Sequence, residues 1–407
     1  MLRTIRNTSF LVFMIISCFS LSGQTRAVVE NAIPDVEWDA AFTRTEGWTG
    51  GDVAGTVNMG DGRTVWMFGD SWIGKVGEGK HVGGSHMINN VIAIHDSSEL
   101  GSVRAPLYKD IHFAWGPNNS ENKPTAWIIP KTRTDGEWYW PSGGGVVIPG
   151  CNGTQKLIVF LFHLARRGEE DSSWNFKHIG SAMAIVDDAQ ETIEKWKTRQ
   201  LTIPYSTKPE SATHIHSPRT INWGVSAILQ IKEPLHEKSG FLYIYGIDDS
   251  EVLNKKLFLA RVYPDDVEKL DQWQFFSGED NWSAFLGDAI SIAENVPSEL
   301  SVNEDVRLNA DTFVMVHSEP LFGRKIMIRR APNPEGPWSD PEPIYTVPGL
   351  DRGKEYFTYA AKGHLHLSRQ NELLVTYIIN ANSIWEMAID AAIYRPRFIR
   401  ASLHPDL

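Results

Sequence analysis

Five hairpin-like units recur along this chain, and this repeat constrains its fold more than any other feature of the sequence. In each unit a small or polar lead-in precedes a first strand, a turn and a strongly apolar second strand. The second strands begin roughly 60 to 90 residues apart, which leaves room for two further strands in each unit. Four strands repeated five times are typical of an all-β protein that folds as a five-bladed β-propeller. The predicted hairpins occupy residues 51–58 with 65–68, 144–148 with 157–162, 223–229 with 241–245, 298–302 with 312–316, and 363–367 with 373–377.

Helical periodicity is scarce in the rest of the chain. The best helical candidate, residues 187–199, is short and polar. A β-sandwich is the alternative architecture, but it would need fewer and more evenly spaced strands. No low-complexity linker follows the first 27 residues, so we expect a single propeller domain over residues 28–407.

The first 27 residues resemble an export signal. Arg3 and Arg6 precede a short apolar segment at residues 10–16, which is too short to span a bilayer stably. Residues 15–18 resemble a lipoprotein box in which Cys18 carries the lipid, and cleavage after Ala27 is the alternative. Both predict export to the periplasm, the medium or the cell surface, with membrane contact only through a lipid anchor on Cys18.

Composition narrows the range of functions. The chain has a net charge of −11 and no run rich in lysine and arginine, which argues against a nucleic-acid partner. Its 15 tryptophans suit stacking on sugar rings as well as packing between sheets. Cys18 and Cys151 are its two cysteines, so the sequence offers neither a disulfide framework nor a cysteine-based metal site. We expect a monomer that binds a carbohydrate and needs no cofactor, with a structural cation in the central channel as an alternative.

Candidate site residues follow from propeller geometry. The start of each first strand and the end of each second strand meet at one face, so side chains there surround one cleft. Carboxyl groups gathered near one axis raise one another's pKa, which is what a general acid needs. The predicted catalytic residues are Asp52, Asp70 and Glu299, and the predicted substrate-binding residues are Trp140, Asn222, Trp223, Asn90, His364, His366 and Glu319.

Asp52 and Asp70 flank the first hairpin symmetrically about its Asp61-Gly62 turn. A three-residue loop with Gly62 in the left-handed conformation would place both side chains on one face, and a two-residue turn would place them on opposite faces. Both arrangements remain open, as do purely structural roles, in which Asp70 caps the next turn and Asp52 accepts from loop amides.

Glu299, His364 and His366 also have structural alternatives. Glu299 enters an apolar strand, so it either acts in the site or forms a salt bridge to a neighbouring blade. His364 and His366 alternate on one predicted strand and share a face. They could hold a cation, orient a carboxylate or bond a sugar hydroxyl, or they could be hydrogen-bonded core histidines.

Several of these segments resemble one known group of proteins. Residues 50–71, with two aspartates around a Gly-Asp turn, resemble the opening blade of secreted bacterial propellers long classed as domains of unknown function. Some relatives of that group are endo-arabinanases, and the group resembles arabinanase-like and fructosidase-like five-bladed glycoside hydrolases. Further matching segments are residues 140–144, 222–224, 298–302, 331–338 and 359–364.

The resemblance implies a glycosidase fold with carboxylates at the channel mouth. It matches Asp52 and Asp70 to the two aspartates of the first blade, and Glu299 to the acidic residue of the fourth. We therefore expect a glycoside hydrolase that acts on a polysaccharide or oligosaccharide by carboxylate acid/base catalysis, with furanose-containing glycans among the candidate substrates. Asp52 is the expected base and Glu299 or Asp70 the expected acid, while Trp140 and Trp223 supply stacking surfaces. The alternatives are a non-catalytic glycan-binding surface propeller and a structural or protein-binding propeller.

Overall fold

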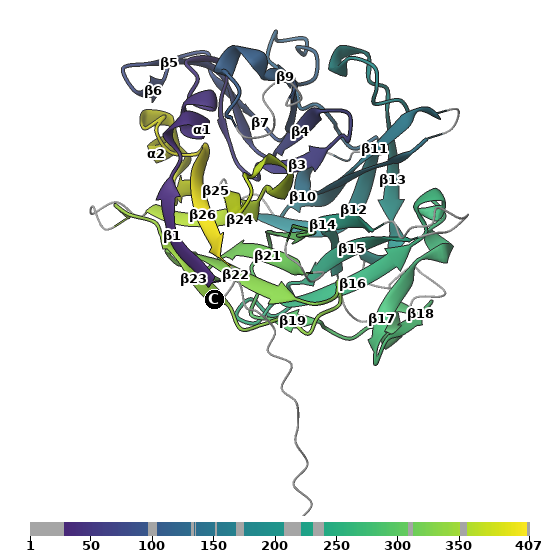
Figure 1. Ribbon diagram of the computed structural model, residues 1–407. Helices are drawn as coiled ribbons and strands as arrows, with labels where there is room; N and C mark the ends of the chain where they lie inside the picture. The colour runs from purple at the N-terminus through teal and green to yellow at the C-terminus, as the bar shows by residue number, and fades with distance from the viewer. Residues whose placement is uncertain are drawn as a thin grey trace, which may run out of the picture.

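A computed structural model describes residues 28–96, 104–131, 134, 136–150, 153–167, 175–206, 221–230, 240–307, 312–350 and 356–404 (Figure 1). The predicted export signal with Cys18, and also Cys151, lie outside these residues. Within these ranges, no helix has the length and apolar character needed to cross a membrane.

Five antiparallel sheets follow one another along the chain, and almost every strand pairs with its neighbour in sequence. The first three sheets are listed from the inner strand outward. They are β3 (Gly55–Asn58), β4 (Arg63–Phe68), β8 (Val91–Asp96) and β9 (His112–Ala114); β10 (Glu137–Pro149), β11 (Gln155–Arg166), β12 (Phe176–Val186) and β13 (Thr198–Ile203); and β14 (Ile221–Gln230), β15 (Phe241–Asp248), β16 (Lys256–Val262) and β17 (Gln274–Gly278), extended by β18 (Asn281–Ser283) and β19 (Ala293–Glu294).

The fifth sheet combines the two ends of the chain, because its outermost strand is β1, which pairs with β26. The fourth and fifth sheets are β20 (Leu300–Glu304), β21 (Phe313–Ser318), β22 (Lys325–Ala331) and β23 (Glu342–Thr346); and β24 (Tyr356–Gly363), β25 (Glu372–Ala381), β26 (Pro396–His404) and β1 (Val28–Pro34). The predicted all-β class is therefore confirmed.

A smaller sheet and two short helices lie beside the first and fifth sheets (Figure 1). The sheet comprises β2 (Glu46–Gly51), β5 (Ser71–Gly77), β6 (Lys80–His81) and β7 (His86–Ile88), and the helices are α1 (Val36–Ala41) and α2 (Ile384–Ile389).

The uninterrupted apolar runs in the second strands arise because both faces of each sheet are covered. Neighbouring residues of a strand point to opposite faces, so each second strand contributes to two apolar layers. In β11, Val159 packs in the layer shared with the first sheet, and Phe160 in the layer shared with the third. In β21, Met315 and Val316 divide in the same way between the third and fifth sheets. The apolar layers therefore run between successive sheets.

The inner strands of the five sheets meet around one narrow central cavity. Lys362 and Gly363 of β24 line it together with Thr56, residues 143–145, Ser226 and residues 301–303 from the other four inner strands. The side chain of Thr56 bonds that of His364 across the junction of the first and fifth sheets, with 2.7 Å between oxygen and Nδ1. The polar lead-ins of the inner strands consequently lie around one axis.

Two expectations about individual elements are wrong. Residues 187–199 form no α-helix; they contain the single 3-10 turn η3 (Ile193–Lys195) and then enter β13, whose edge position tolerates polar side chains. Residues 363–367 are not the first strand of the fifth hairpin, because β24 ends at Gly363 and the 3-10 turn η8 (Leu365–Leu367) follows.

Candidate active site

Hairpin β3–β4 brings Asp52 and Asp70 side by side. The backbone N–H of Met59 donates to the carbonyl of Arg63, and Gly62 has a φ of 95°. This closes a three-residue loop, the first of the two geometries that the sequence left open. At the other end of the hairpin the N–H of Asp52 donates to the carbonyl of Asp70 over 3.3 Å.

The carboxyl group of Asp52 is held by two tyrosines from the end of the chain. The hydroxyls of Tyr359 and Tyr394 both donate to its Oδ2, over 2.6 and 2.9 Å. Its Oδ1 is buried and has no hydrogen-bond partner within the described ranges. Burial, together with the charges of Asp70 and Glu299, raises the pKa of Asp52 to about 8 even though the tyrosines favour the anion.

Backbone strain gathers around this carboxyl group. Val53 and Ala54, which follow Asp52, have φ values of 66° and 48°. Ala360, next to Tyr359, has a φ of 55°, and Tyr394 itself has a φ of 58°. Residues other than glycine rarely adopt this region, and such strain concentrates at functional sites, where the surrounding fold enforces it.

Asp70 lies in a different electrostatic setting. Its Oδ1 accepts hydrogen bonds from the indole N–H of Trp140 over 2.7 Å and from the amide of Asn89 over 3.1 Å. Burial raises its pKa to about 6, and the two hydrogen bonds limit the rise. The indole N–H of Trp140 bonds Asp70, so Trp140 enters the site as a hydrogen-bond donor as well as an aromatic ring.

Glu299 precedes β20 and forms an ion pair across the fourth and fifth sheets. The ammonium of Lys362 lies 2.8 Å from its Oε2, and the lysine side chain is only 1% exposed. The position of Gly143 leaves room for this lysine, since a Cβ there would lie 2.6 Å from its Cε. The salt bridge to a neighbouring sheet, one of the alternatives for Glu299, is therefore present, and the charge of Glu299 also acts on Asp52.

The two histidines do not share a strand face, since β24 ends before them. His364 is buried, and its two ring nitrogens bond the hydroxyls of Thr56 and Thr376 over 2.7 and 2.8 Å. His366 lies in η8, with a buried Nε2 that no described residue bonds. Across the described residues, no group of three or more His, Cys, Asp or Glu side chains has the arrangement of a metal site.

Asn90 and Glu319 have structural partners. The amide of Asn90 donates to the carbonyls of Ile128 and Tyr139 over 2.9 Å each, which ties the start of β8 to β10. The carboxylate of Glu319 accepts from two backbone N–H groups of its own turn, between β21 and β22. Neither side chain contacts Asp52, Asp70 or Glu299 through a recorded hydrogen bond.

Trp223 and Asn222 differ in their surroundings. Trp223 is fully buried against Trp273 and Phe275, so its ring offers no stacking surface to a sugar, and the expectation that it stacks on substrate is wrong. Asn222 is also buried, but its amide donates to the carboxylate of Asp249 over 3.1 Å, at the end of the third sheet where β15 turns into β16.

Sequence reasoning missed Tyr359, Tyr394 and Lys362. Tyr359 and Lys362 fall within the segment 359–364 that carried the family resemblance, but the predicted strand began after them. Tyr394 follows α2 in an irregular segment, and no sequence pattern marks it.

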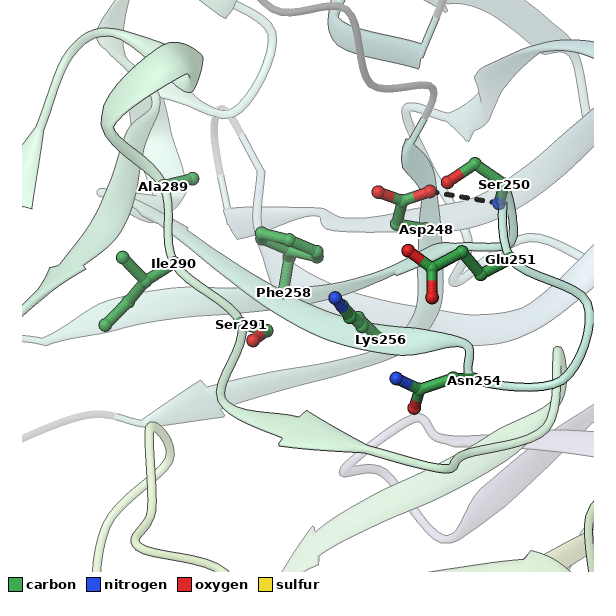
Figure 2. A pocket seen from close by; sticks show the side chains of 9 residues that line it. All are labelled: Asp248, Ser250, Glu251, Asn254, Lys256, Phe258, Ala289, Ile290 and Ser291. Atoms are coloured by element: carbon green, nitrogen blue, oxygen red, sulfur yellow. Dashed lines mark hydrogen bonds between the residues drawn. The ribbon is translucent and has the colours of Figure 1, made fainter.

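A separate polar pocket opens on the third sheet (Figure 2). Asp248 and Glu251 extend from the β15–β16 turn, Lys256 and Phe258 from β16, and residues 289–291 form the facing wall. Asn254 also lines it. None of Asp52, Asp70 and Glu299 lines this pocket.

Solved structures share the architecture. A protein from Bacteroides ovatus, described as a candidate hydrolase, matches with a TM-score of 0.62 at 20% identity, over 91% of this chain and 90% of its own. An exo-β-1,3-galactanase from Phanerochaete chrysosporium matches with a TM-score of 0.44 at 8% identity, over 91% of this chain and 64% of its own. An α-L-arabinofuranosidase from Podospora anserina matches with a TM-score of 0.41 at 10% identity, over 89% of this chain and 98% of its own. The Bacteroides likeness shows a shared fold.

Comparison of sequences gives the family. None of the curated proteins matches this chain. The model of the domain of unknown function DUF5005 matches residues 35–403, which is nearly all of the chain after the predicted export signal. The chain therefore belongs to the DUF5005 family.

Proposed function

We propose that this protein is a secreted five-bladed β-propeller glycoside hydrolase that cleaves a polysaccharide or oligosaccharide, with furanose-containing glycans as the first substrates to test. One observation carries the proposal: Asp52 and Asp70 lie side by side at the open end of hairpin β3–β4, and their surroundings separate their pKa values. Hydrolysis of a glycosidic bond by acid/base chemistry needs two carboxyl groups in different protonation states.

The pKa values suggest a role for each carboxyl group. At pH 7 Asp52, with a pKa of about 8, holds its proton, whereas Asp70, with a pKa of about 6, is mostly ionised. Asp52 is thus suited to protonate the leaving oxygen as the glycosidic C–O bond breaks. Asp70 is suited to take a proton from the water whose oxygen bonds the anomeric carbon. This assignment reverses the sequence-based expectation that Asp52 is the base.

Glu299 takes a supporting role in this scheme. Its charge is one of the causes that raise the pKa of Asp52, and Lys362 holds it in place from the fifth sheet. Glu299 therefore helps to keep the proton on Asp52 instead of donating one itself.

A hydrolytic function agrees with the Bacteroides ovatus protein, which shares the fold and is itself described as a candidate hydrolase. The strained residues around Asp52 support a functional role for its carboxyl group, since such strain clusters at active sites and ligand clamps.

The decisive experiment is a screen for released sugar on arabinan, galactan and fructan with the unaltered protein, Asp52→Asn and Asp70→Asn. We expect hydrolysis of at least one glycan by the unaltered protein and a loss of about 100-fold or more in each variant. Equal sugar release by all three proteins would refute the proposal. Binding without hydrolysis by the unaltered protein would favour the non-catalytic alternative.

Export and lipid attachment are part of the proposal. The Arg3–Arg6 start, the short apolar segment and Cys18 support a lipoprotein signal, with cleavage after Ala27 as the alternative. Fractionation of cells that express the full chain or Cys18→Ala tests this. The variant should leave the membrane fraction if Cys18 carries the lipid. We also propose that the protein acts as a monomer without a cofactor.

A further inference from the structure

A continuous series of contacts leads from Asp70 through the second sheet to the third. The indole of Trp140 bonds Asp70 and packs edge-on against Phe176, with ring centroids 4.9 Å apart. Phe176 in turn lies 6.3 Å from the ring of His178. The charges of Asp249 and Lys255, at the β15–β16 turn, both act on the pKa of that imidazole.

A second series returns from the third sheet to Asp52. The ammonium of Lys255 donates to the hydroxyl of Ser298, the residue before Glu299. The charges of Asp249 and Glu299 both act on Lys255, and the charge of Glu299 reaches Asp52. Together the two series form a closed ring of side chains around the face that holds Asp52. The third sheet is separated from the first by the second, whose inner strand β10 packs against both β3 and β14.

The third-sheet side of the ring contains a polar group without a partner. Asn222 is 2% exposed, and its Nδ2 donates to Oδ2 of Asp249 over 3.1 Å. Its Oδ1 is buried and accepts no hydrogen bond from the described parts of the chain, and the same holds for Nδ1 of His178 and Oδ1 of Asp52. A buried polar atom without a partner costs about 1–3 kcal/mol, so three of them on one ring point to a ligand that supplies hydrogen bonds.

The charges on the ring indicate the chemistry of that ligand. The ammonium groups of Lys255 and Lys362 lie beside carboxylates, so neither presents an uncompensated positive charge. At the third-sheet end of the ring, the carboxylate of Asp249 and Oδ1 of Asn222 are both hydrogen-bond acceptors, which would repel a sugar that carries a carboxylate. An uncharged sugar avoids this repulsion, and its adjacent hydroxyls can each donate one hydrogen bond and accept another.

We propose that Asn222 and Asp249, on the third-sheet side of this ring, form a subsite that binds adjacent hydroxyls of an uncharged sugar ring. The subsite deepens the proposed hydrolase function, since the bound sugar is the one whose bond would be cleaved. Asp249 accepts from one hydroxyl, and Oδ1 of Asn222 accepts from its neighbour.

Binding can be measured without turnover in the Asp52→Asn background. We would titrate oligosaccharides of arabinose and of galactose, and oligogalacturonate as the charged counterpart, by isothermal calorimetry. At least one uncharged oligosaccharide should bind at least 10-fold more tightly than oligogalacturonate. Adding Asn222→Ala or Asp249→Asn should weaken that binding by 10-fold or more, because the site's remaining polar groups lose their partners.

Asn254→Ala is the matched control, because Asn254 lies in the same turn as Asp249 but lines the pocket of Figure 2. It should leave binding unchanged. Weaker binding in Asn254→Ala together with full binding in Asn222→Ala would overturn the proposal, as would preference for oligogalacturonate or no binding of either uncharged oligosaccharide. If Asn222→Ala fails to fold, Asp249→Asn, which keeps the side-chain shape, decides the question.

The two proposals fail in different ways. If Asn222→Ala alone weakens binding but the unaltered chain hydrolyses no glycan, the hydrolase proposal fails and the subsite stands. If the unaltered chain hydrolyses a glycan and Asn222→Ala leaves its KM unchanged, the subsite proposal fails and the hydrolase stands.

Discussion

Asp52 holds a proton that its own residue type would lose in water at neutral pH. Burial and two nearby carboxylates raise the pKa of Asp52. The backbone is strained both next to Asp52 and around the two tyrosines that bond its carboxyl group. Asp70 has a smaller rise, because an indole and an amide stabilise its anion. The same short hairpin therefore carries two carboxyl groups that differ in protonation near pH 7.

A pH profile tests the proposed pair directly. If Asp70 must be ionised and Asp52 protonated, kcat/KM rises with pH through about 6 and falls through about 8, and is greatest near pH 7. Because the two groups interact, the limbs report the pair and not either residue alone. A profile that keeps rising beyond pH 9 would contradict the role of Asp52 as acid.

The indole of Trp140 should influence the acidic limb more than the basic one. Trp140→Phe removes the donor that stabilises the Asp70 anion, so the pKa of Asp70 rises and the acidic limb moves to higher pH. Trp138→Phe is the control, because the Nε1 of Trp138 has no partner in the part of the chain that the structure describes. Equal shifts in both variants would show that the hydrogen bond is irrelevant.

The protonated Asp52 also makes stability depend on pH. Folding raises its pKa from 3.8 to about 8, so between these pH values the folded chain keeps a proton that the unfolded chain has lost. This contribution is complete below pH 3.8 and is lost as pH rises through 8. Asp52→Asn removes the dependence, so its advantage in free energy of unfolding should grow with pH and reach a few kcal/mol, roughly, at pH 8.

Denaturant unfolding at pH 4, 6 and 8 measures that difference. Asp61→Asn, at the turn of the same hairpin, serves as the control, because it changes an aspartate that lies outside the site. A constant difference between Asp52→Asn and the unaltered protein across this range would argue against a raised pKa.

A local rule predicted the pairing of Asp52 with Asp70 from the sequence, whereas their catalytic roles stay predictions. Asp52 and Asp70 came from the symmetry of one hairpin, which the structure bears out in its register. Tyr359, Tyr394 and Lys362 could not be found in this way, because each reaches its carboxylate from a segment distant in sequence. Pairing over such distances depends on how the sheets close around the axis, and no local pattern encodes it.

Among the elements, β24 is the one that serves the site twice. Its pairing with β25 shifts between Tyr359 and Lys362, whose partners are Ile378 and Thr376. Those partners are two residues apart and share a face, so the bulge places Tyr359 and Lys362 on one face although they are three apart. The bulge thus delivers one residue to Asp52 and the other to Glu299.

Ser318 should control this bulge. Its hydroxyl accepts from the N–H of Ala361 over 3.2 Å, so Ser318→Ala leaves that N–H unsatisfied and costs about 1–3 kcal/mol of stability. Because Tyr359 and Lys362 would move, activity at 25 °C should fall as well.

Ser339→Ala is the comparison. The hydroxyl of Ser339 accepts a 3.1 Å hydrogen bond from the backbone N–H of Arg330, and this contact lies away from the site. This variant should lower the melting temperature without changing kcat. Equal effects of the two variants on kcat would contradict the positioning role of the bulge.

The strands themselves were predicted best where both faces are buried. The second strands read as continuous apolar runs because neighbouring residues enter two different layers, as Val159 and Phe160 do. An edge strand such as β13 lacks that signal, because most of its side chains are at least partly exposed. The fifth hairpin was predicted at the wrong residues because the bulge in β24 interrupts the alternation of buried and exposed positions.

Across the whole molecule, β1 completes the fifth sheet by pairing with β26, so the two ends of the chain hold each other. Within the same junction, Arg400 forms an ion pair with the buried Asp35. A chain that starts at Asp35 would lack β1 and expose the edge of β26.

We expect that truncated chain to melt several degrees lower than a chain starting at Val28, and to aggregate through the uncovered edge. Circular dichroism melts and light scattering of the two chains measure both effects. The same melting temperature for both would mean that β1 adds nothing to closure.

The distances in sequence between Asp52 and its two tyrosines have a consequence for the order in which the surroundings of this carboxyl group form. Asp52 leaves the ribosome well before Tyr359 and Tyr394, which follow it by 307 and 342 residues. A partly made chain, or one cut short by a premature stop, therefore has its carboxyl groups without the hydroxyls that orient them. The environment of this carboxyl group is therefore complete only once the fifth sheet has been made and has packed against the first hairpin.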